Sequence, residues 1–220
     1  MPNESHTRDT TEFDGKRVLV TGGTRGIGEA IVNRLAGGGA TVIATAAQAQ
    51  TLTFDNLPAR TVIPNGYGGL NWSNFEVIDG IAEPSNGYHN GTISPNNVAF
   101  NSFGNPADLT SATPFTLSSG YFTAAWNNGL SLEVQGFAGA SLLYDHTYIL
   151  NTASPQLLSF NFIGITDAHF ISSGGTNPGL SGSGIQFAMD NLTIGSVPEP
   201  STMALTGLGA IAGLFFRRRK

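Results

Sequence analysis

Three glycines near the start of the chain have the spacing of a phosphate-binding turn. Gly22 and Gly26 lie between a short apolar run at residues 17–20 and residues 27–35, where apolar side chains recur at helical spacing, and Gly28 lies at the start of that helical segment. Glycines allow a backbone to approach a phosphate closely, and a helix N-terminus offers unpaired N–H groups and the positive end of its dipole. A second apolar run comes after the helical segment. The pattern therefore predicts one β-α-β unit with a glycine turn inside it.

The glycine turn also resembles a known cofactor motif. Residues 21–28 read Thr-Gly-Gly-Thr-Arg-Gly-Ile-Gly, which is similar to the opening motif of short-chain dehydrogenase/reductases. The resemblance implies that Gly22, Gly26 and Gly28 would line the phosphates of a dinucleotide, with Arg25 favouring NADP. It covers only about the first fifth of the chain.

The rest of that family's machinery is missing. Its catalysis needs a Tyr with a Lys four residues later, because the Lys lowers the pKa of the phenol. Neither Lys16 nor Lys220 follows a Tyr at that spacing. A single β-α-β unit also cannot bury both faces of its sheet. We expect residues 1–46 to be a truncated Rossmann-type fragment with a vestigial cofactor turn and no bound cofactor. An NAD(P)-dependent oxidoreductase is the alternative function.

The chain ends in three parts of different chemistry. The first is a stiff, proline-containing motif made of Val197, Pro198, Glu199 and Pro200. The second, residues 203–216, carries no charge but is short for a membrane span, which needs about 20 residues. The third is a basic cluster, which favours the cytoplasmic side of a membrane, made of Arg217, Arg218, Arg219 and Lys220.

This order of parts resembles the PEP-CTERM sorting signal of exported bacterial proteins. The resemblance implies that residues 196–220 form a transient membrane anchor, which a transpeptidase-like protease recognises near the Pro-Glu-Pro motif. It also implies an association with exopolysaccharide production. A buried C-terminal helix is the other interpretation. Its glycines at 207, 209 and 213 disfavour a soluble helix, and the basic end would have no role.

The middle of the chain has the pattern of an all-β domain. Short β-rich runs are separated by turn signals about every 10 residues. The candidate strands are residues 51–54, 74–78, 97–101, 121–126, 130–137, 142–150, 157–162, 168–171 and 185–194. Their number favours a jelly-roll-like β-sandwich over residues 50–195. The predicted protein is therefore mainly β, preceded by the β-α-β fragment and followed by a C-terminal hydrophobic helix.

Charge and cysteine content exclude some functions of this middle segment. Between residues 50 and 197 the only basic residue is Arg60, against nine acids. Such a segment cannot neutralise phosphates, so we expect no nucleic-acid partner. The chain has no cysteine, which excludes disulfides and thiolate chemistry. Residues 68–75 and 187–194 resemble sandwich domains that precede sorting tails.

Few residues of the middle segment point to chemistry. His89, His146 and His169 lack metal-ligand spacing, so we predict no metal site. Asp145 and His146 lack a nucleophile motif beside them. A sandwich hydrolase acting on glycans would need two facing carboxylates, which the sequence does not pair.

Two binding roles stay open for this segment. Asp190-Asn191 or Asp55-Asn56 could donate oxygen ligands to calcium, although such residues more often cap turns. Aromatic residues could stack on sugar rings or lie in the core, and the core is the more frequent place. They are Trp72, Trp126, Tyr67, Tyr88 and Tyr121.

The composition changes abruptly near residues 44–47. Residues 47–49, Ala-Gln-Ala, resemble the cleavage site of a secretory signal peptide, with Gln50 as the first mature residue. We interpret the join as a fusion that replaced most of a signal peptide, so export of this chain is doubtful. The sequence predicts a non-enzymatic cell-surface or matrix protein, anchored in the membrane by its tail and processed by a sorting protease. Polysaccharide is its candidate ligand.

Overall fold

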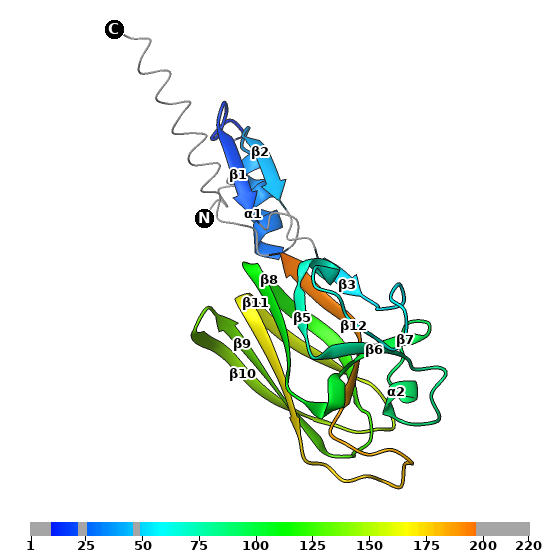
Figure 1. Ribbon diagram of the computed structural model, residues 1–220. Coiled ribbons are helices and arrows are strands. Elements are labelled where there is room, and N and C mark those ends of the chain that lie inside the picture. The colour runs from blue at the N-terminus through cyan, green and yellow to red at the C-terminus, as the bar shows by residue number, and fades with distance from the viewer. Residues whose placement is uncertain (1–9, 22–25, 46–48, 197–220) are drawn as a thin grey trace, which may run out of the picture. The chain divides into compact units, whose positions relative to one another are not determined.

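The computed structural model describes residues 10–21, 26–45 and 49–196, in which two compact units are separate along the chain (Figure 1). The first contains the described residues up to 45, and the second begins at Ala49. The predicted C-terminal helix lies outside the described residues. Among the described helices, none combines the length and the apolar character needed to cross a bilayer.

The first unit has the predicted strand–helix–strand order. Strand β1 (Arg17–Thr21) pairs in parallel with β2 (Thr41–Thr45), and helix α1 (Gly26–Ala36) connects them. The helix ends because Gly39 adopts a positive φ of 92° and the Ala40 N–H donates to the Leu35 carbonyl at 3.1 Å.

Little of this first unit is buried. Among its described side chains, Val20 is the only buried hydrophobic one, whereas Leu19, Ile31 and Ile43 are exposed. One helix can cover only one face of a two-stranded sheet. The small number of buried side chains is therefore what we expected of a lone β-α-β unit.

The second unit is a sandwich-like domain made of antiparallel strands. They run in the order β10-β9-β11-β8-β12-β7-β6-β4, and β3 and β5 join β12 and β8 respectively. The bounds are β3 Ala49–Leu52, β4 Thr61–Val62, β5 Asn71–Ser73, β6 Phe75–Asp79, β7 Asn97–Asn101, β8 Ala107–Ala124, β9 Leu130–Ala138, β10 Ser141–Leu150, β11 Gln156–Ser173 and β12 Phe187–Ser196. Two turns, η1 (Tyr67–Gly69) and η2 (Ser102–Gly104), and the one-turn helix α2 (Gly87–Asn90) connect them.

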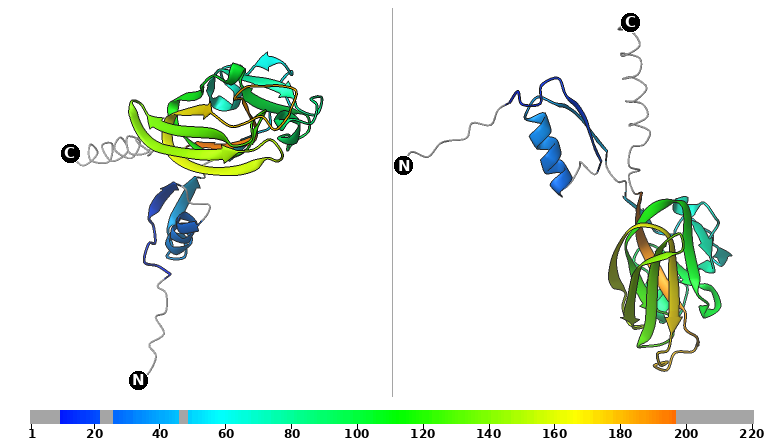
Figure 2. Two further views of the ribbon diagram at one scale, coloured as in Figure 1. Left: turned by 90° about the horizontal axis from the view of Figure 1, so that it is seen from below. Right: turned by 90° about the vertical axis from the view of Figure 1, so that its left-hand side faces the viewer.

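The sheet folds back on itself to enclose the core (Figure 2). β9 stands between β10 and β11 in the strand order, yet Tyr148 on β10 and Phe160 on β11 meet with ring centres 5.6 Å apart. On the other side, Phe75 of β6 packs edge-on against Phe170 of β11 at 5.7 Å. Such contacts across the layers close the sandwich, and its interior is rich in phenylalanine.

Bulges let the two longest strands bend around this core. Thr110 pairs with Asp167 and Phe115 with Ile165, so residues 111–114 of β8 face a single residue of β11. Pro114 lies in this interruption, where no ladder hydrogen bond from its nitrogen is needed. The mainly β prediction is confirmed, but the sequence pattern located only the end of β8 and divided β11 into two strands.

Candidate functional site

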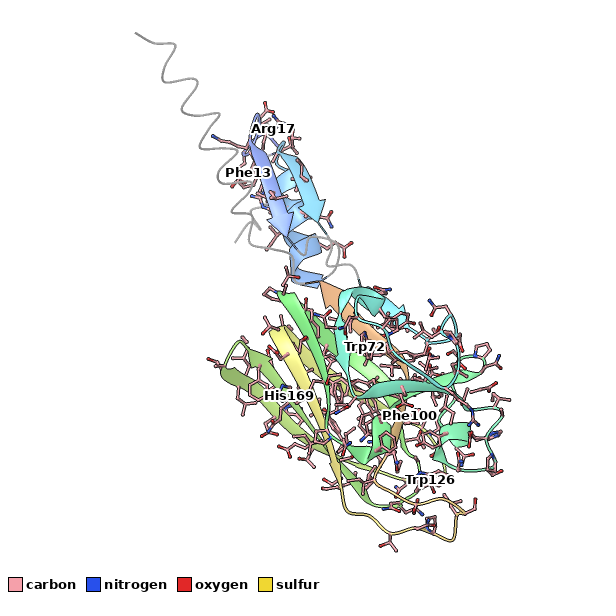
Figure 3. All side chains as sticks on the ribbon, viewed as in Figure 1. Phe13, Arg17, Trp72, Phe100, Trp126 and His169 are labelled. Atoms are coloured by element: carbon pink, nitrogen blue, oxygen red, sulfur yellow. The ribbon has the colours of Figure 1, made fainter. Side chains whose placement is uncertain are left out.

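Three aromatic side chains from separate segments form a patch beside the main core. Tyr88 of α2 packs edge-on against Phe100 of β7, with ring centres 5.3 Å apart, and against Trp126 at 5.6 Å. Tyr88 is buried, while Phe100 and Trp126 are only partly buried. We call these three residues the aromatic patch; Phe100 and Trp126 are labelled in Figure 3.

Helix α2 positions Tyr88 in the patch. Asn86 caps the helix, since its Oδ1 accepts hydrogen bonds from the N–H groups of Tyr88 and His89 at 2.9 and 3.1 Å. A Cβ on Gly87 would lie 1.7 Å from the Ala124 carbonyl oxygen, so only glycine allows this close approach to β8. Burial raises the pKa of the Tyr88 phenol well above its ordinary value. Tyr88 is therefore a neutral, rigid part of the patch.

Carboxylates flank the aromatic patch. Glu76 on β6 pairs directly with Phe100 on β7, and its Oε1 accepts a hydrogen bond of 2.5 Å from the Ser102 hydroxyl. Glu83 lies 3.6 Å from the Arg60 guanidinium. Aromatic rings beside hydrogen-bonding carboxylates are the groups that bind sugars, whose rings have apolar faces and hydroxyl edges.

An exposed phenylalanine lies two residues after β7. Phe103 is 86% exposed and has a φ of +55°, a conformation that costs energy for a bulky residue. The next residue, Gly104, contacts Ile185. Gly182, which is in the same loop as Ile185, contacts the Trp126 ring. The sequence pattern singled out neither Phe100 nor Phe103. Phe100 is one apolar residue of a predicted strand, and periodicity does not reveal the positive φ of Phe103.

Two of the other aromatic candidates pack in the core, the place that the sequence favoured for them. Trp72 is buried, and its indole Nε1–H donates to the Tyr67 carbonyl at 2.9 Å. The Tyr67 hydroxyl donates to Asn56 Oδ1 at 2.9 Å and accepts from the Phe54 N–H at 3.2 Å. These contacts support the core interpretation for Trp72 and Tyr67. Tyr121 is partly buried on β8.

The two calcium candidates bind backbone groups instead. Asp190 is fully buried, and its carboxylate accepts hydrogen bonds from the N–H groups of Ile93, Ser94 and Asn191 at 2.7, 2.8 and 2.6 Å. Burial raises the pKa of this carboxyl, and the hydrogen bonds partly oppose that rise. Asp55 Oδ1 accepts from the Asn97 N–H at 3.0 Å. Both aspartates thus hold loops together.

The histidines do not form one centre. His146 packs against Phe162, whereas the neighbouring Asp145 contacts Gln135 on the other side of β10. His169 Nδ1 lies 3.9 Å from Asp108 Oδ1. Over residues 10–21, 26–45 and 49–196, no three His, Asp or Glu side chains gather as a metal ion would require.

Two carboxylates share the outer face of β9 and β10. The Gln135 amide donates to Glu133 Oε1 at 2.7 Å and to Asp145 Oδ2 at 3.3 Å. The structure thus brings together a pair of acids that the sequence could not connect. Gln135 occupies the space between them, where a hydrolase would place its substrate.

Most of the predicted site residues at the two ends of the chain lie outside the described residues. Gly26 and Gly28 form the first turn of α1, where the cofactor turn was expected. Gly22 lies outside the described residues. So do the sorting residues 197–200 and the basic cluster 217–220.

Comparison with known proteins identifies the C-terminal segment. Residues 196–220 match the PEP-CTERM protein-sorting motif, which marks exported, membrane-associated proteins. The sorting signal predicted at this end is thereby confirmed. The likeness of residues 13–45 to short-chain dehydrogenases stays a prediction.

Whole-chain similarity is weak. No curated protein matches the chain. Among solved structures, a family two carbohydrate esterase from Cellvibrio japonicus is similar at 12% identity and a TM-score of 0.37, over 69% of this chain and 34% of the esterase. The chain thus spans about a third of the esterase's length. TmCBM61 in complex with β-1,4-galactotriose is similar at 10% identity and a TM-score of 0.33, over 62% of this chain and 98% of that one. Likenesses this weak assign no ligand.

Proposed function

We propose that this chain is a non-enzymatic surface protein whose β-sandwich is exported, held at the membrane by its tail, and binds polysaccharide. The observation that carries the proposal is the continuity of two parts. β12 ends at Ser196, where the PEP-CTERM motif begins. The sandwich is therefore the domain directly joined to the sorting signal, and the signal would export it. Within the proposal, the partner that processes the tail is a transpeptidase-like protease.

The ligand part of the proposal rests on the aromatic patch and its surroundings. Phe100 and Trp126 are partly accessible beside Glu76, and Phe103 is exposed on the turn that follows β7. Between residues 50 and 197, nine acids face one arginine, so an anionic polymer would be repelled. We infer that the ligand is a neutral polysaccharide.

Localisation tests the sorting part of the proposal. The join near residues 44–47 argues against export of the full chain, whereas the matched sorting motif argues for it, and the proposal follows the motif. The full chain, expressed in a bacterium that makes the sorting protease, should therefore reach the cell surface, and truncation after Ser196 should abolish membrane retention. A variant with P198A, E199A and P200A keeps the apolar segment and the basic cluster, so it should stay in the membrane unprocessed. Full-length protein that remains in the cytoplasm would contradict the proposal.

Retention on polysaccharides tests the ligand part. Affinity electrophoresis of the full chain in gels that contain neutral or anionic polysaccharides should show retardation by a neutral one. Equal mobility in all gels would contradict the assignment of a polysaccharide ligand, without affecting the sorting part of the proposal.

A further inference from the structure

One end of the sandwich brings together the end of β12, the bulged middle parts of β8 and β11, and the β9–β10 turn. Ser196 at the end of β12 pairs with Phe115 on β8, which also pairs with Ile165 on β11. The tip of the β9–β10 hairpin is at the same end, because the Gly139 N–H donates to Thr166 Oγ1 at 2.9 Å. We call this the tail-proximal end; Figure 1 labels β8 and β11 beside the arrowhead of β12.

The tail-proximal end is apolar and exposed. Leu142 and Leu143 are each 48% exposed and Ile163 is 60% exposed. The Tyr144 hydroxyl joins these elements, since it lies 3.2 Å from the Ile163 carbonyl oxygen and 3.3 Å from the Ile163 nitrogen.

This end carries little charge. The segments that build it contain no Asp, Glu, Lys or Arg, whereas the domain as a whole is acidic; they are residues 111–118, 138–144, 160–166 and 191–196. The partly buried Asp167 follows one of them, and its Oδ2 accepts a hydrogen bond of 2.5 Å from the Thr166 hydroxyl. Exposed leucine and isoleucine on a surface with so few charges indicate contact with another apolar phase.

The sorting tail limits which surface can meet the end. Six residues, 197–202, separate Ser196 from the uncharged segment that begins at Met203. A chain of that length spans at most about 20 Å when fully extended. With the tail in a bilayer, the tail-proximal end therefore stays within that distance of the lipid headgroups.

We propose that the tail-proximal end docks on the membrane surface, with Leu142, Leu143 and Ile163 in the boundary between headgroups and acyl chains. This inference rests on the anchoring in the proposed function. Three partly exposed aliphatic side chains bind a membrane weakly when alone, but the tether gives the contact a high effective concentration. The acids on the other surfaces disfavour any other orientation toward an anionic leaflet.

Site-specific labels can measure this orientation, because the natural chain has no cysteine. The exposed residues Ala140 and Ser154 flank β10 at its two ends, which are about 30 Å apart along a strand of this length. The full chain carrying A140C or S154C, labelled with a fluorophore, is reconstituted in phosphatidylcholine vesicles that contain a headgroup spin label. Quenching at position 140 should exceed that at position 154 by about fivefold or more, given their separation.

A matched pair of variants separates the proposed contact from general hydrophobicity. Combining L142S, L143S and I163S should lower the quenching at position 140 to the level that the tether alone gives, while the quenching at 154 stays low. Combining I149S and L157S removes side chains that are 56% and 52% exposed at the other end, and should leave it unchanged. Equal changes in both variants would overturn the docking.

Flotation of the vesicles distinguishes the two proposals. If the wild-type chain floats with the vesicles while the label at position 140 stays unquenched, the docking is overturned and the anchoring stands. The same conclusion holds if the label is unquenched because it is buried against another part of the protein. Wild-type chain that does not float overturns the anchoring, and the docking with it.

Discussion

The hydroxyl of Tyr144 hydrogen-bonds the backbone of Ile163 on β11, where no β9 residue pairs with it. It lies 3.3 Å from the backbone nitrogen and 3.2 Å from the carbonyl oxygen of Ile163, in the half of β11 that β9 does not pair. One phenol thus accepts from one backbone group and donates to the other. The Tyr144 ring also stacks on Phe162 at 4.6 Å, which fixes the hydroxyl in place.

We therefore expect Y144F to destabilise the sandwich without changing its fold. The variant keeps the ring stacking and loses both hydrogen bonds, so the free energy of unfolding should fall by about 1–2 kcal/mol. Urea denaturation followed by tryptophan fluorescence measures it. The control is Y148F, because the Tyr148 hydroxyl contacts only the exposed His146 ring at 3.3 Å. An equal loss in both variants would contradict the role assigned to Tyr144.

Asp190 should make the stability of the sandwich depend on pH. Burial raises the pKa of its carboxyl in the folded state above the ordinary value. The folded state then holds the proton over a range where the unfolded state has released it. The contribution of Asp190 to the free energy of unfolding must accordingly fall as the pH rises through that range.

The variant D190N tests this titration. The Ile93 and Ser94 N–H groups donate to Oδ2 and the Asn191 N–H group donates to Oδ1. An amide keeps only one acceptor oxygen, so one side loses its acceptor, and we expect a loss of about 1–3 kcal/mol at neutral pH. The loss should be greater at about pH 4 than at about pH 7, because the wild type gains stability toward acid and D190N does not. Urea denaturation across this pH range would refute the assignment if the difference stayed constant.

The variant F103N should separate binding from stability. Asn adopts a positive φ more readily than Phe, so the free energy of unfolding should rise by about 1 kcal/mol. Retardation in neutral polysaccharide gels should weaken, because the most exposed ring near the aromatic patch is gone. The matched control is I81N, which removes a 52% exposed apolar side chain in another loop and should leave retardation unchanged. If F103N is retarded as strongly as the wild type, Phe103 is not part of the binding site.

Local pattern predicted the regular strands better than the interrupted ones. Residues 97–101 and 130–137 were predicted as strands and form β7 and nearly all of β9, because apolar alternation and turn signals agree there. The first part of β8 was missed, since Ser111–Pro114 interrupts the alternation. One of the turn signals between the predicted strands, Asn90-Gly91, lies at the end of α2.

The candidate site could not be predicted in the same way. Tyr88, Phe100 and Trp126 come from three elements, and only the fold of the sheet brings them together. Trp72 and Trp126 look alike in sequence, but a core cluster encloses one and a glycine-rich loop covers part of the other. Phe103 combines high exposure with a positive φ, and no side-chain pattern in the sequence encodes either.

The boundary near residue 49 gives a last prediction. Ala49 already pairs with Gly195, so the sheet of the sandwich begins there, and Gln50, the residue after the predicted signal cleavage site, is inside β3. In the first unit, Val20 is the one buried hydrophobic side chain among those described. Limited proteolysis should therefore cut between residues 44 and 50 and leave a resistant core that extends to about residue 195.

Calorimetry on the intact chain should detect neither NADP(H) nor NAD(H) binding, because one β-α-β unit supplies half of a mononucleotide-binding fold at most. Micromolar binding, with residues 10–45 protected from protease, would instead establish a working nucleotide site in the first unit.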